Sequence, residues 1–290
     1  MKSFAIIGGD KRNIALAQLL FEQGHDVRMF GFEKYEREFF MHCKNIGEVI
    51  AGANYIIGAT PCSHGGEILN APFHAKPLSA KSVFELIQPH QIFIAGHVSE
   101  AIHEAALKYS VQLVDMLERE ELLILNAIPT AEGAIKIAIE ETDFTLHASE
   151  IMVIGYGRIG QVLCRMLAGI GARVTTVVNS PHAYAHAKSA SHNPVYFEDI
   201  KPHLSGMAVV YNTVPKAVLD ASNMSLLKNN VLIIDLASPP YGVDSAVARD
   251  LGLRVLYSTS LPGKVAPATT AKYMLDTVWQ IIEEAKGELL

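Results

Sequence analysis

Cysteine is scarce in this sequence. The chain has three, Cys43, Cys62 and Cys164, which lie far apart and form no CxxC pair. This spacing excludes a disulfide framework and gives no pattern for a structural zinc site. We therefore expect reduced, mostly buried thiols and no metal.

Long apolar runs and runs of one charge are absent as well. No stretch reaches the roughly 18 to 20 apolar residues that span a bilayer, and the apolar run Phe4–Ile7 stops too soon for a signal peptide. The 30 acidic and 24 basic residues give a net charge of −6, and neither sign clusters. We expect a cytoplasmic protein that binds neither nucleic acid nor membrane.

What is present is the pattern of a two-domain α/β protein. The chain has 290 residues, half of them apolar, and short apolar runs alternate with segments of helical period, as in βαβ units with a parallel sheet. The expected strands are Phe4–Ile7, Val27–Phe30, Tyr55–Ala59, Ile92–Ala95 and Val111–Met116 in the first half, and Ile151–Ile154, Val174–Val178, Ala208–Tyr211, Val231–Asp235 and Val255–Ser258 in the second.

The boundary between the domains lies in a helical segment. A helix over 120–126 is expected to break at Pro129, with Thr130 as the N-cap of a second helix that runs through Ile139. We predict two Rossmann-like domains, 1–128 and 129–266, joined by hinge helices with a cleft between them. A helix over 267–290 is expected to return to the first domain.

The strongest local motif is a glycine turn. A strand runs directly into Gly155-Tyr-Gly157-Arg158-Ile159-Gly160, and a helical run follows. Gly155 permits the tight turn, Gly157 lets the backbone approach a pyrophosphate, and Gly160 lets helix and strand pack closely. The helix start would then face the anion, so the motif predicts a dinucleotide site.

The choice of cofactor depends on the end of the next strand. NAD sites usually carry Asp or Glu there, whereas this chain has Asn179 and Ser180. Together with His182 and Arg158, these side chains can donate hydrogen bonds to a 2′-phosphate, which favours NADP over NAD. An alternative interpretation of Ser180 is that it merely caps a helix.

Other cofactor contacts are expected where later strands end, because ligands of open parallel sheets bind beyond the carboxyl ends of strands. The turns there are rich in small and rigid residues, a composition that turn geometry alone also produces. The candidates are Asn212, Thr213, Val214 and Pro215, then Ala237 and Ser238, then Pro262 and Gly263.

The first half carries a similar glycine turn at Gly8-Gly9, but Asp10 and Asn13 stand where the second and third glycines would be. A carboxylate and a bulkier side chain disfavour phosphate there. We expect Asp10 to cap its helix and this domain to bind the substrate instead.

Two places in the first domain are candidates for substrate carboxylates. The segment 60–65 brings hydroxyls, an imidazole and glycine N–H groups together, and Arg119 can form a two-pronged pair with a carboxylate. Alternatives are a solvated turn at 60–65 and an ion pair of Arg119 with Glu118 or Glu121. The loop candidates are Thr60, Pro61, Ser63, His64 and Gly65.

Several strings, in this order, resemble the family of dipicolinate synthase A subunits over essentially the whole chain. They are Leu117-Glu-Arg-Glu, Asn126-Ala-Ile-Pro-Thr-Ala-Glu-Gly133, the 155–160 turn, Asp235-Leu-Ala-Ser238 and Leu261-Pro-Gly-Lys-Val-Ala-Pro267. D-2-hydroxyacid and alanine dehydrogenases are expected to share the layout.

The resemblance implies that the chain, with a flavoprotein B subunit, forms dipicolinate from a 4-hydroxy-tetrahydrodipicolinate in the mother cell of sporulating bacteria. It implies a dicarboxylate substrate, contacts from Asn126 and Thr130, and Glu118, His64 or Glu132 as proton carriers. We also expect an oligomer. The competing hypotheses are a non-catalytic nucleotide-binding partner of the flavoprotein and a hydroxyacid or alanine dehydrogenase.

Overall fold

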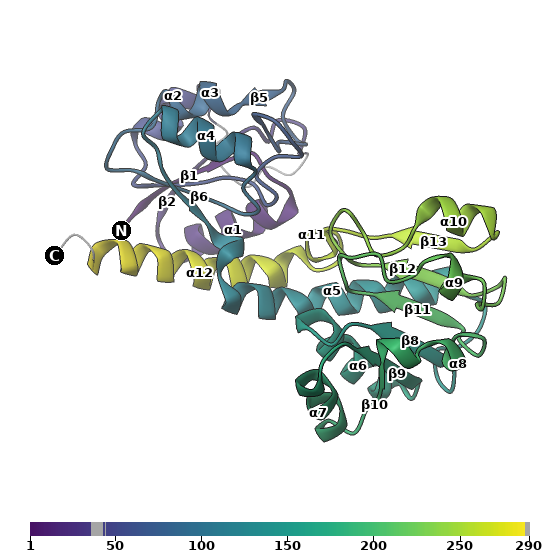
Figure 1. The fold of residues 1–290 in the computed structure, drawn as a ribbon. Helices are drawn as coiled ribbons and strands as arrows, with labels where there is room; N and C mark the ends of the chain where they lie inside the picture. The colour runs from purple at the N-terminus through teal and green to yellow at the C-terminus, as the bar shows by residue number, and fades with distance from the viewer. Residues whose placement is uncertain (36–42, 44, 288–290) are drawn as a thin grey trace. The chain divides into compact units, whose positions relative to one another are not determined.

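The computed structural model describes residues 1–35, 43 and 45–287. The chain divides into two compact units, one formed by Met1–Leu125 and Ala266–Leu290 and the other by Asn126–Val265. Each unit is built on a parallel sheet covered by helices (Figure 1), which confirms the predicted α/β class. The last three residues of the expected helix 267–290 lie outside the described residues.

The first unit has a five-stranded parallel sheet in the order β2-β1-β3-β6-β7, in which the chain moves first to one side of β1 and then to the other. All five expected strands are present. A short antiparallel pair, β4 (Ile68–Leu69) and β5 (Leu78–Ser79), was not expected. The sheet strands are β1 (Ser3–Ile7), β2 (Asp26–Phe30), β3 (Tyr55–Ile57), β6 (Ile92–Ala95) and β7 (Gln112–Asp115).

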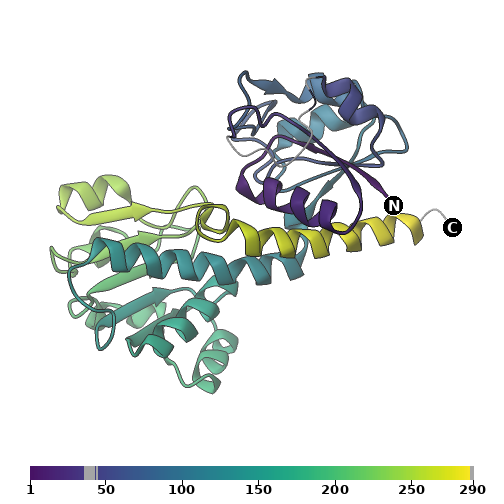
Figure 2. The ribbon, with the colours of Figure 1, turned by 180° about the vertical axis from the view of Figure 1, so that it is seen from behind.

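Helices cover both faces of this sheet because successive strand side chains point to opposite sides. Phe4 and Ile6 of β1 pack with α1 and α12, whereas Ala5 and Ile7 pack in the opposite core. Figures 1 and 2 show α12 lying along α1, so the C-terminal helix completes the first unit's core. The helices are α1 (Lys11–Glu22), α2 (Ile46–Ala51), α3 (Ala80–Phe84), α4 (Glu100–Lys108), the 3₁₀ helix η1 (Met116–Glu118) and α12 (Pro267–Gly287).

The second unit has a six-stranded parallel sheet in the order β10-β9-β8-β11-β12-β13. The sequence analysis did not predict the edge strand β10, whose sequence contains Pro194. Proline within a sheet is confined to edge positions such as this one. The strands are β8 (Glu150–Ile154), β9 (Arg173–Val178), β10 (Asn193–Tyr196), β11 (Val209–Asn212), β12 (Leu232–Asp235) and β13 (Arg254–Tyr257).

Helices again lie on both faces of the second sheet. Ile151 and Val153 pack against α5 and α6, and Met152 and Ile154 face the opposite core with α8, α9 and α10. The elements are α5 (Glu120–Glu141), α6 (Arg158–Ile170), α7 (Pro181–Ser189), the 3₁₀ helix η2 (Phe197–Asp199), α8 (Lys201–Leu204), α9 (Ala221–Met224), α10 (Ser245–Asp250) and α11 (Leu261–Val265).

The expected break at Pro129 is wrong, because α5 is one helix with Pro129 inside it. Thr130 is not an N-cap: its hydroxyl donates a hydrogen bond to the carbonyl of Asn126 (2.7 Å), as threonine does within helices. Packing of the helix face against the core outweighs the hydrogen bond that proline removes.

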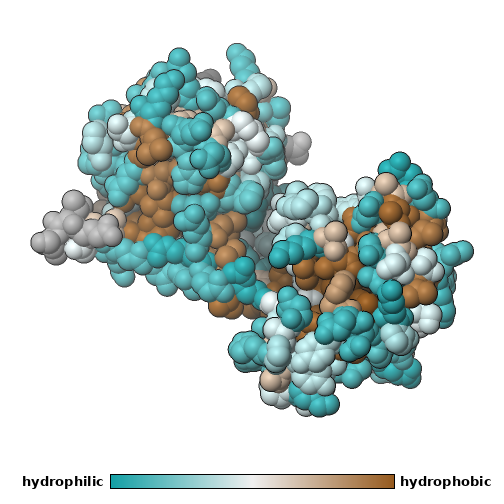
Figure 3. Space-filling view, viewed as in Figure 1, coloured by the Kyte–Doolittle hydropathy of each residue, from teal (hydrophilic) through white to brown (hydrophobic). Residues whose placement is uncertain are grey.

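One described helix, α5, is long and apolar enough to cross a membrane by length and composition. Its residues Ala131, Ala134 and Ala138 are fully buried in the second unit's core, so this is weak evidence for a membrane span. On the face seen in Figure 3, hydrophilic side chains surround smaller hydrophobic patches in both units.

Candidate functional site

The glycine turn after β8 has the close packing that the sequence predicts. Gly155 has φ +98°, and a Cβ built there would lie 2.4 Å from Thr213 Oγ1. A Cβ on Gly160 would lie 2.1 Å from the carbonyl oxygen of Gly155. A side chain at Gly160 would therefore push α6 away from the turn, and one at Gly155 would collide with Thr213 after β11.

The start of α6 has no side-chain cap. Gly157 occupies the N-cap position in an extended conformation and, having no side chain, makes no side-chain cap bond to the first N–H groups of the helix. These donors carry the positive end of the helix dipole, which is the usual arrangement for binding a phosphate.

A cavity of about 620 Å³ adjoins this turn. Six of the predicted cofactor residues line it: Gly155, Gly157, Asn179, Thr213, Val214 and Pro215. The ends of β8, β9 and β11 thus converge on one space that is large enough for part of a dinucleotide. The other predicted cofactor residues do not line this cavity: Arg158, Ile159, Gly160, Ser180, His182, Asn212, Ala237, Ser238, Pro262 and Gly263.

The cavity has further lining residues that sequence reasoning missed. Phe197 and Glu198 follow the unpredicted edge strand β10, and Lys216 follows β11. A prediction of β10 would have made Phe197 and Glu198 candidates, because they follow the carboxyl end of that strand. Glu198 and Lys216 bring one charge of each sign to the cavity.

The end of β9 supports the interpretation of Ser180 as a helix cap. Its hydroxyl accepts a hydrogen bond from the N–H of Ala183 (3.2 Å) and so caps α7. The rings of His182 and His186 lie on one face of that helix with centroids 4.5 Å apart. No group of three metal-ligating side chains is found within the described part of the chain.

A buried carboxylate holds the loop after β12. Asp235 is fully buried and accepts hydrogen bonds from the Nδ2 of Asn212 (2.8 Å) and from the N–H groups of Ala237 (3.0 Å), Gly242 (2.9 Å) and Val243 (3.0 Å). The predicted cofactor residues Asn212 and Ala237 thus use these donors within the protein. The sequence analysis gave Asp235 no role of its own, although it begins one of the strings that carry the family resemblance.

Asn212 also shapes the cavity wall. Its Oδ1 accepts from the N–H of Val214 (3.1 Å), and its Nδ2 donates to the carbonyl of the same residue (3.0 Å). The side chain therefore fixes the turn that carries Thr213 and Val214. Ser238 is exposed, whereas Pro262 and Gly263 lie within the short helix α11.

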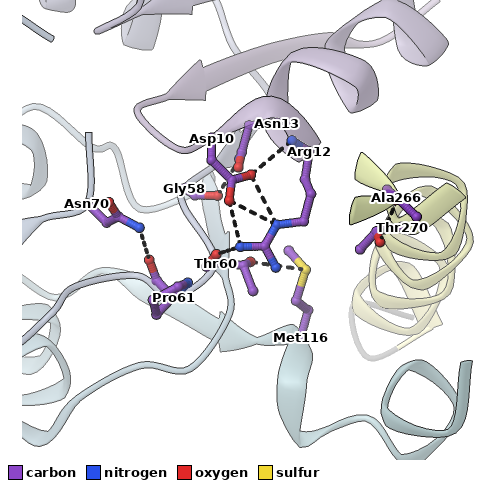
Figure 4. A network of polar contacts seen from close by, with 10 residues as sticks. All are labelled: Asp10, Arg12, Asn13, Gly58, Thr60, Pro61, Asn70, Met116, Ala266 and Thr270. Carbon is purple, nitrogen blue, oxygen red and sulfur yellow. Dashed lines mark hydrogen bonds and ion pairs between the residues drawn. The ribbon is translucent and has the colours of Figure 1, made fainter. Parts of the chain in front are cut away.

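The corresponding turn of the first unit is filled by protein groups (Figure 4). Asp10 caps α1 as predicted, with its Oδ1 accepting from the N–H of Arg12 (2.9 Å). Asn13 donates from Nδ2 to the carbonyl of Gly58 (2.8 Å), and a Cβ on Gly9 would lie 2.2 Å from its Cγ. These side chains occupy the position that a phosphate would need.

The predicted substrate loop of the first unit separates into two parts. Thr60 and Ser63 are buried, and the Ser63 hydroxyl lies 3.0 Å from that of Ser99. His64 and Gly65 are exposed and line a surface pocket of about 530 Å³. Pro61 contributes its carbonyl to the Nδ2 of Asn70 (3.1 Å; Figure 4).

Arg119 has a partner that the sequence did not suggest. Its two terminal nitrogens donate to both carboxylate oxygens of Glu284 on α12, with Nη1 at 2.9 Å from Oε1. The hydrogen bond with Glu284 raises the pKa of Arg119, and the same bond lowers the pKa of Glu284. The expected alternatives, ion pairs with Glu118 or Glu121, are replaced by this contact, and Glu118 is exposed at the end of η1.

The remaining candidates lie along α5. Glu132 is exposed in the middle of the helix. Asn126 and Thr130 are half-buried, and the Oδ1 of Asn126 is buried without a hydrogen-bond partner among the described residues. The proton carriers expected from the sequence thus lie on separate elements: Glu118 on η1, His64 after β3 and Glu132 on α5.

Comparison with known proteins identifies the family. Residues 3–117 match the N-terminal domain of the dipicolinate synthase A subunit, and residues 130–251 match the NAD binding domain of D-isomer specific 2-hydroxyacid dehydrogenases. The chain is 30% identical over 287 residues to the A subunit of dipicolinate synthase from Bacillus subtilis strain 168, covering 98% of this chain and 97% of that protein. The chain belongs to the family of dipicolinate synthase A subunits.

Solved structures agree with this family. The A chain of dipicolinate synthase from Bacillus subtilis superposes with a TM-score of 0.87 at 29% identity, covering 99% of this chain and 97% of that one. The A subunit from Bacillus halodurans gives 0.88 at 26% identity, covering 97% of each chain. Membership of this family and the dehydrogenase-type NAD binding domain together support an oxidoreductase role for this chain, with a nicotinamide dinucleotide as its cofactor.

Proposed function

We propose that this chain uses NADP to form dipicolinate, pyridine-2,6-dicarboxylate, from a 4-hydroxy-tetrahydrodipicolinate-type precursor. The observation that carries the proposal is the uncapped start of α6 at Gly157 beside the 620 Å³ cavity, in a chain of this family. We further propose that it works with a flavoprotein B subunit, as an oligomer, in the cytoplasm of the mother cell during sporulation.

The proposed conversion of the precursor to dipicolinate consists of one dehydration and one two-electron oxidation. The precursor loses water, and the resulting dihydro ring loses a hydride and a proton to become aromatic. NADP⁺ supplies the hydride acceptor when it is bound. The α6 start would hold the diphosphate of the cofactor, and Asn212, which bonds Asp235, fixes the turn that carries Thr213 and Val214 beside it.

Preference for NADP is supported by the end of β9. Asn179 lines the cavity where an NAD site usually presents a carboxylate, so no charge at this position repels a 2′-phosphate. Glu198 is exposed at the same cavity and opposes this preference, and Lys216 offsets its charge. Arg158, at the first turn of α6, is proposed to add a donor.

The preference is tested with two variants and a control. We expect Asn179→Asp to weaken NADP⁺ binding at least tenfold and to leave NAD⁺ binding within about threefold, because a carboxylate repels the extra phosphate. Arg158→Ala should weaken NADP⁺ more than NAD⁺, and Glu198→Gln should strengthen NADP⁺. Equal effects on the two cofactors, measured by calorimetric titration, would exclude a phosphate contact at this end of β9.

Turnover decides between a catalytic role and a nucleotide-binding role for this chain. The purified chain, with and without the flavoprotein B subunit, is incubated with the cyclic precursor and NADP⁺ while pyridine absorbance and NADPH are followed together. Dipicolinate and NADPH formed in equal amounts by this chain alone support the proposal. Dipicolinate formed only with the flavoprotein, while NADP⁺ is unchanged, would refute it.

A further inference from the structure

Arg12 is a buried arginine that the function proposed above does not use. It is the second residue of α1 and only 4% exposed. In Figure 4 its guanidinium group lies between Asp10 and the segment that follows β3. Its Nε and Nη2 donate to the carboxylate of Asp10 (3.0 and 2.8 Å), and Nη2 also donates to the carbonyl of Thr60.

The other terminal nitrogen, Nη1, has no hydrogen-bond partner in the part of the chain that the structure describes. It is not among the fully enclosed polar atoms that lack a partner, so some of its surface is accessible although the side chain as a whole is buried. A buried guanidinium is stable only when its donors are used. Asp10 satisfies one side of the group, and the opposite side offers two N–H donors.

The surroundings define the kind of ligand. The Nη1 side of the group lies beside Thr60 and the thioether of Met116 (Figure 4), and Met116 is fully buried in the apolar core. A positive donor next to an apolar wall fits an anionic group attached to a flat carbon ring. The turn itself is closed to phosphate by Asp10 and Asn13, which leaves the guanidinium as the anion-binding group.

We propose that Arg12 binds one carboxylate of the ring dicarboxylate through Nη1. This inference rests on the proposed function for the identity of the ligand. It replaces Arg119 as the carboxylate-binding arginine of the first unit, because both terminal nitrogens of Arg119 are used by Glu284. Arg12 is a substrate-binding residue in this proposal, and the pair with Asp10 orients its guanidinium group.

The test is equilibrium binding of pyridine-2,6-dicarboxylate to the full chain, with the neutral pyridine-2,6-dicarboxamide as the uncharged probe. We expect Arg12→Lys to weaken dicarboxylate binding about 10- to 100-fold, the effect of losing a charge-assisted hydrogen bond. NADP⁺ binding and the melting temperature serve as readouts of the fold. Arg28→Lys is the matched control, since Arg28 forms a surface pair with Asp26 (3.0 Å) in the same unit.

A second variant predicts the opposite sign. Asp10→Asn keeps an oxygen that accepts from the helix N–H but removes the negative charge beside the guanidinium, so dicarboxylate binding should tighten several-fold, while dicarboxamide binding stays constant. This variant keeps the proposal testable if Arg12→Lys fails to fold. Unchanged or weaker dicarboxylate binding in Asp10→Asn would contradict it.

The outcomes separate this inference from the function on which it rests. If the wild-type chain binds no pyridine dicarboxylate, the proposed substrate class is wrong, and the role of Arg12 falls with it. If the wild type binds it and Arg12→Lys binds it equally well, or if Arg119→Lys is the variant that loses affinity, the inference about Arg12 is wrong while the proposed function stands.

Discussion

Glycine-to-alanine substitutions at three positions of the α6 region separate effects on packing from effects on ligand binding. Gly160→Ala adds a methyl group against the turn, Gly157→Ala adds one at the uncapped helix start, and Gly169→Ala adds one in the last turn of the helix. The Cβ atoms built at Gly157 and Gly169 meet nothing within 4 Å.

The expected magnitudes differ for each position. In Gly160→Ala the new carbon lies 2.1 Å from the oxygen and 2.9 Å from the carbon of the Gly155 carbonyl. Both contacts are with backbone, so the helix start must move, at a cost of about 1–3 kcal/mol. Gly157 has φ −83°, which any residue adopts, so Gly157→Ala should change stability by less than about 0.5 kcal/mol. Gly169→Ala should stabilise by about 0.5–1 kcal/mol, because alanine favours the helix.

Calorimetry of the apo chain and NADP⁺ titration check these values together. We expect Gly160→Ala to lower the melting temperature by a few degrees, as about 2–4 °C per kcal/mol applies to units of this size. Gly157→Ala should melt like the wild type but bind NADP⁺ at least tenfold more weakly, because its methyl group obstructs the N–H donors. Undiminished NADP⁺ binding in Gly157→Ala would refute the phosphate site at the α6 start.

Two further predictions concern buried groups. Asp235→Asn places an amide NH₂ against N–H donors, so it should lower the free energy of unfolding by about 2–4 kcal/mol in urea titrations; a loss below about 0.5 kcal/mol would contradict this role. Burial raises the pKa of Cys164 to about 12, and burial together with the charge of Asp115 raises that of Cys62 to about 12, from the ordinary 9.0. The two thiols lose their protons at a lower pH in the unfolded chain than in the folded chain. The free energy of unfolding should therefore fall as the pH rises from 9 towards 12. In a variant that carries both Cys62→Ala and Cys164→Ala, the free energy of unfolding should fall less over this pH range. A fall equal to that of the wild type would show that other groups cause the pH dependence.

Much of the fold follows from local sequence because strands buried on both faces are continuous apolar runs. Ile92–Ala95 is such a run and matches β6 as predicted. The strand β10 escaped prediction because an edge strand tolerates polar residues and Pro194. Because β10 was not predicted, Phe197 and Glu198 at its end were not predicted as site residues, although they line the cavity.

The candidate site was predictable only where backbone geometry dictates the residue. Glycine is required at Gly155 by its positive φ and at Gly160 by a contact within the same turn, so the motif is visible in sequence. The partner of Arg119, by contrast, lies 165 residues further along the chain. Arg12 pairs locally with Asp10, but it also donates to the carbonyl of Thr60, 48 residues away, and no local pattern reveals that second contact.

The chain uses a strand, glycine turn and helix in the same order in both units, with different side chains at the turn. In both units the first glycine of the turn, Gly8 or Gly155, donates its N–H to the carbonyl at the end of the neighbouring strand at 2.9 Å. The residue at the helix N-cap is extended in both, but it is Asp10 in one and Gly157 in the other. A carboxylate at that position satisfies the helix donors from within the protein, whereas glycine leaves them for an external anion. We therefore expect the identity of the cap to decide whether the helix start offers its N–H groups to a phosphate, as proposed at Gly157, or leaves anion binding to a side chain, as proposed for Arg12.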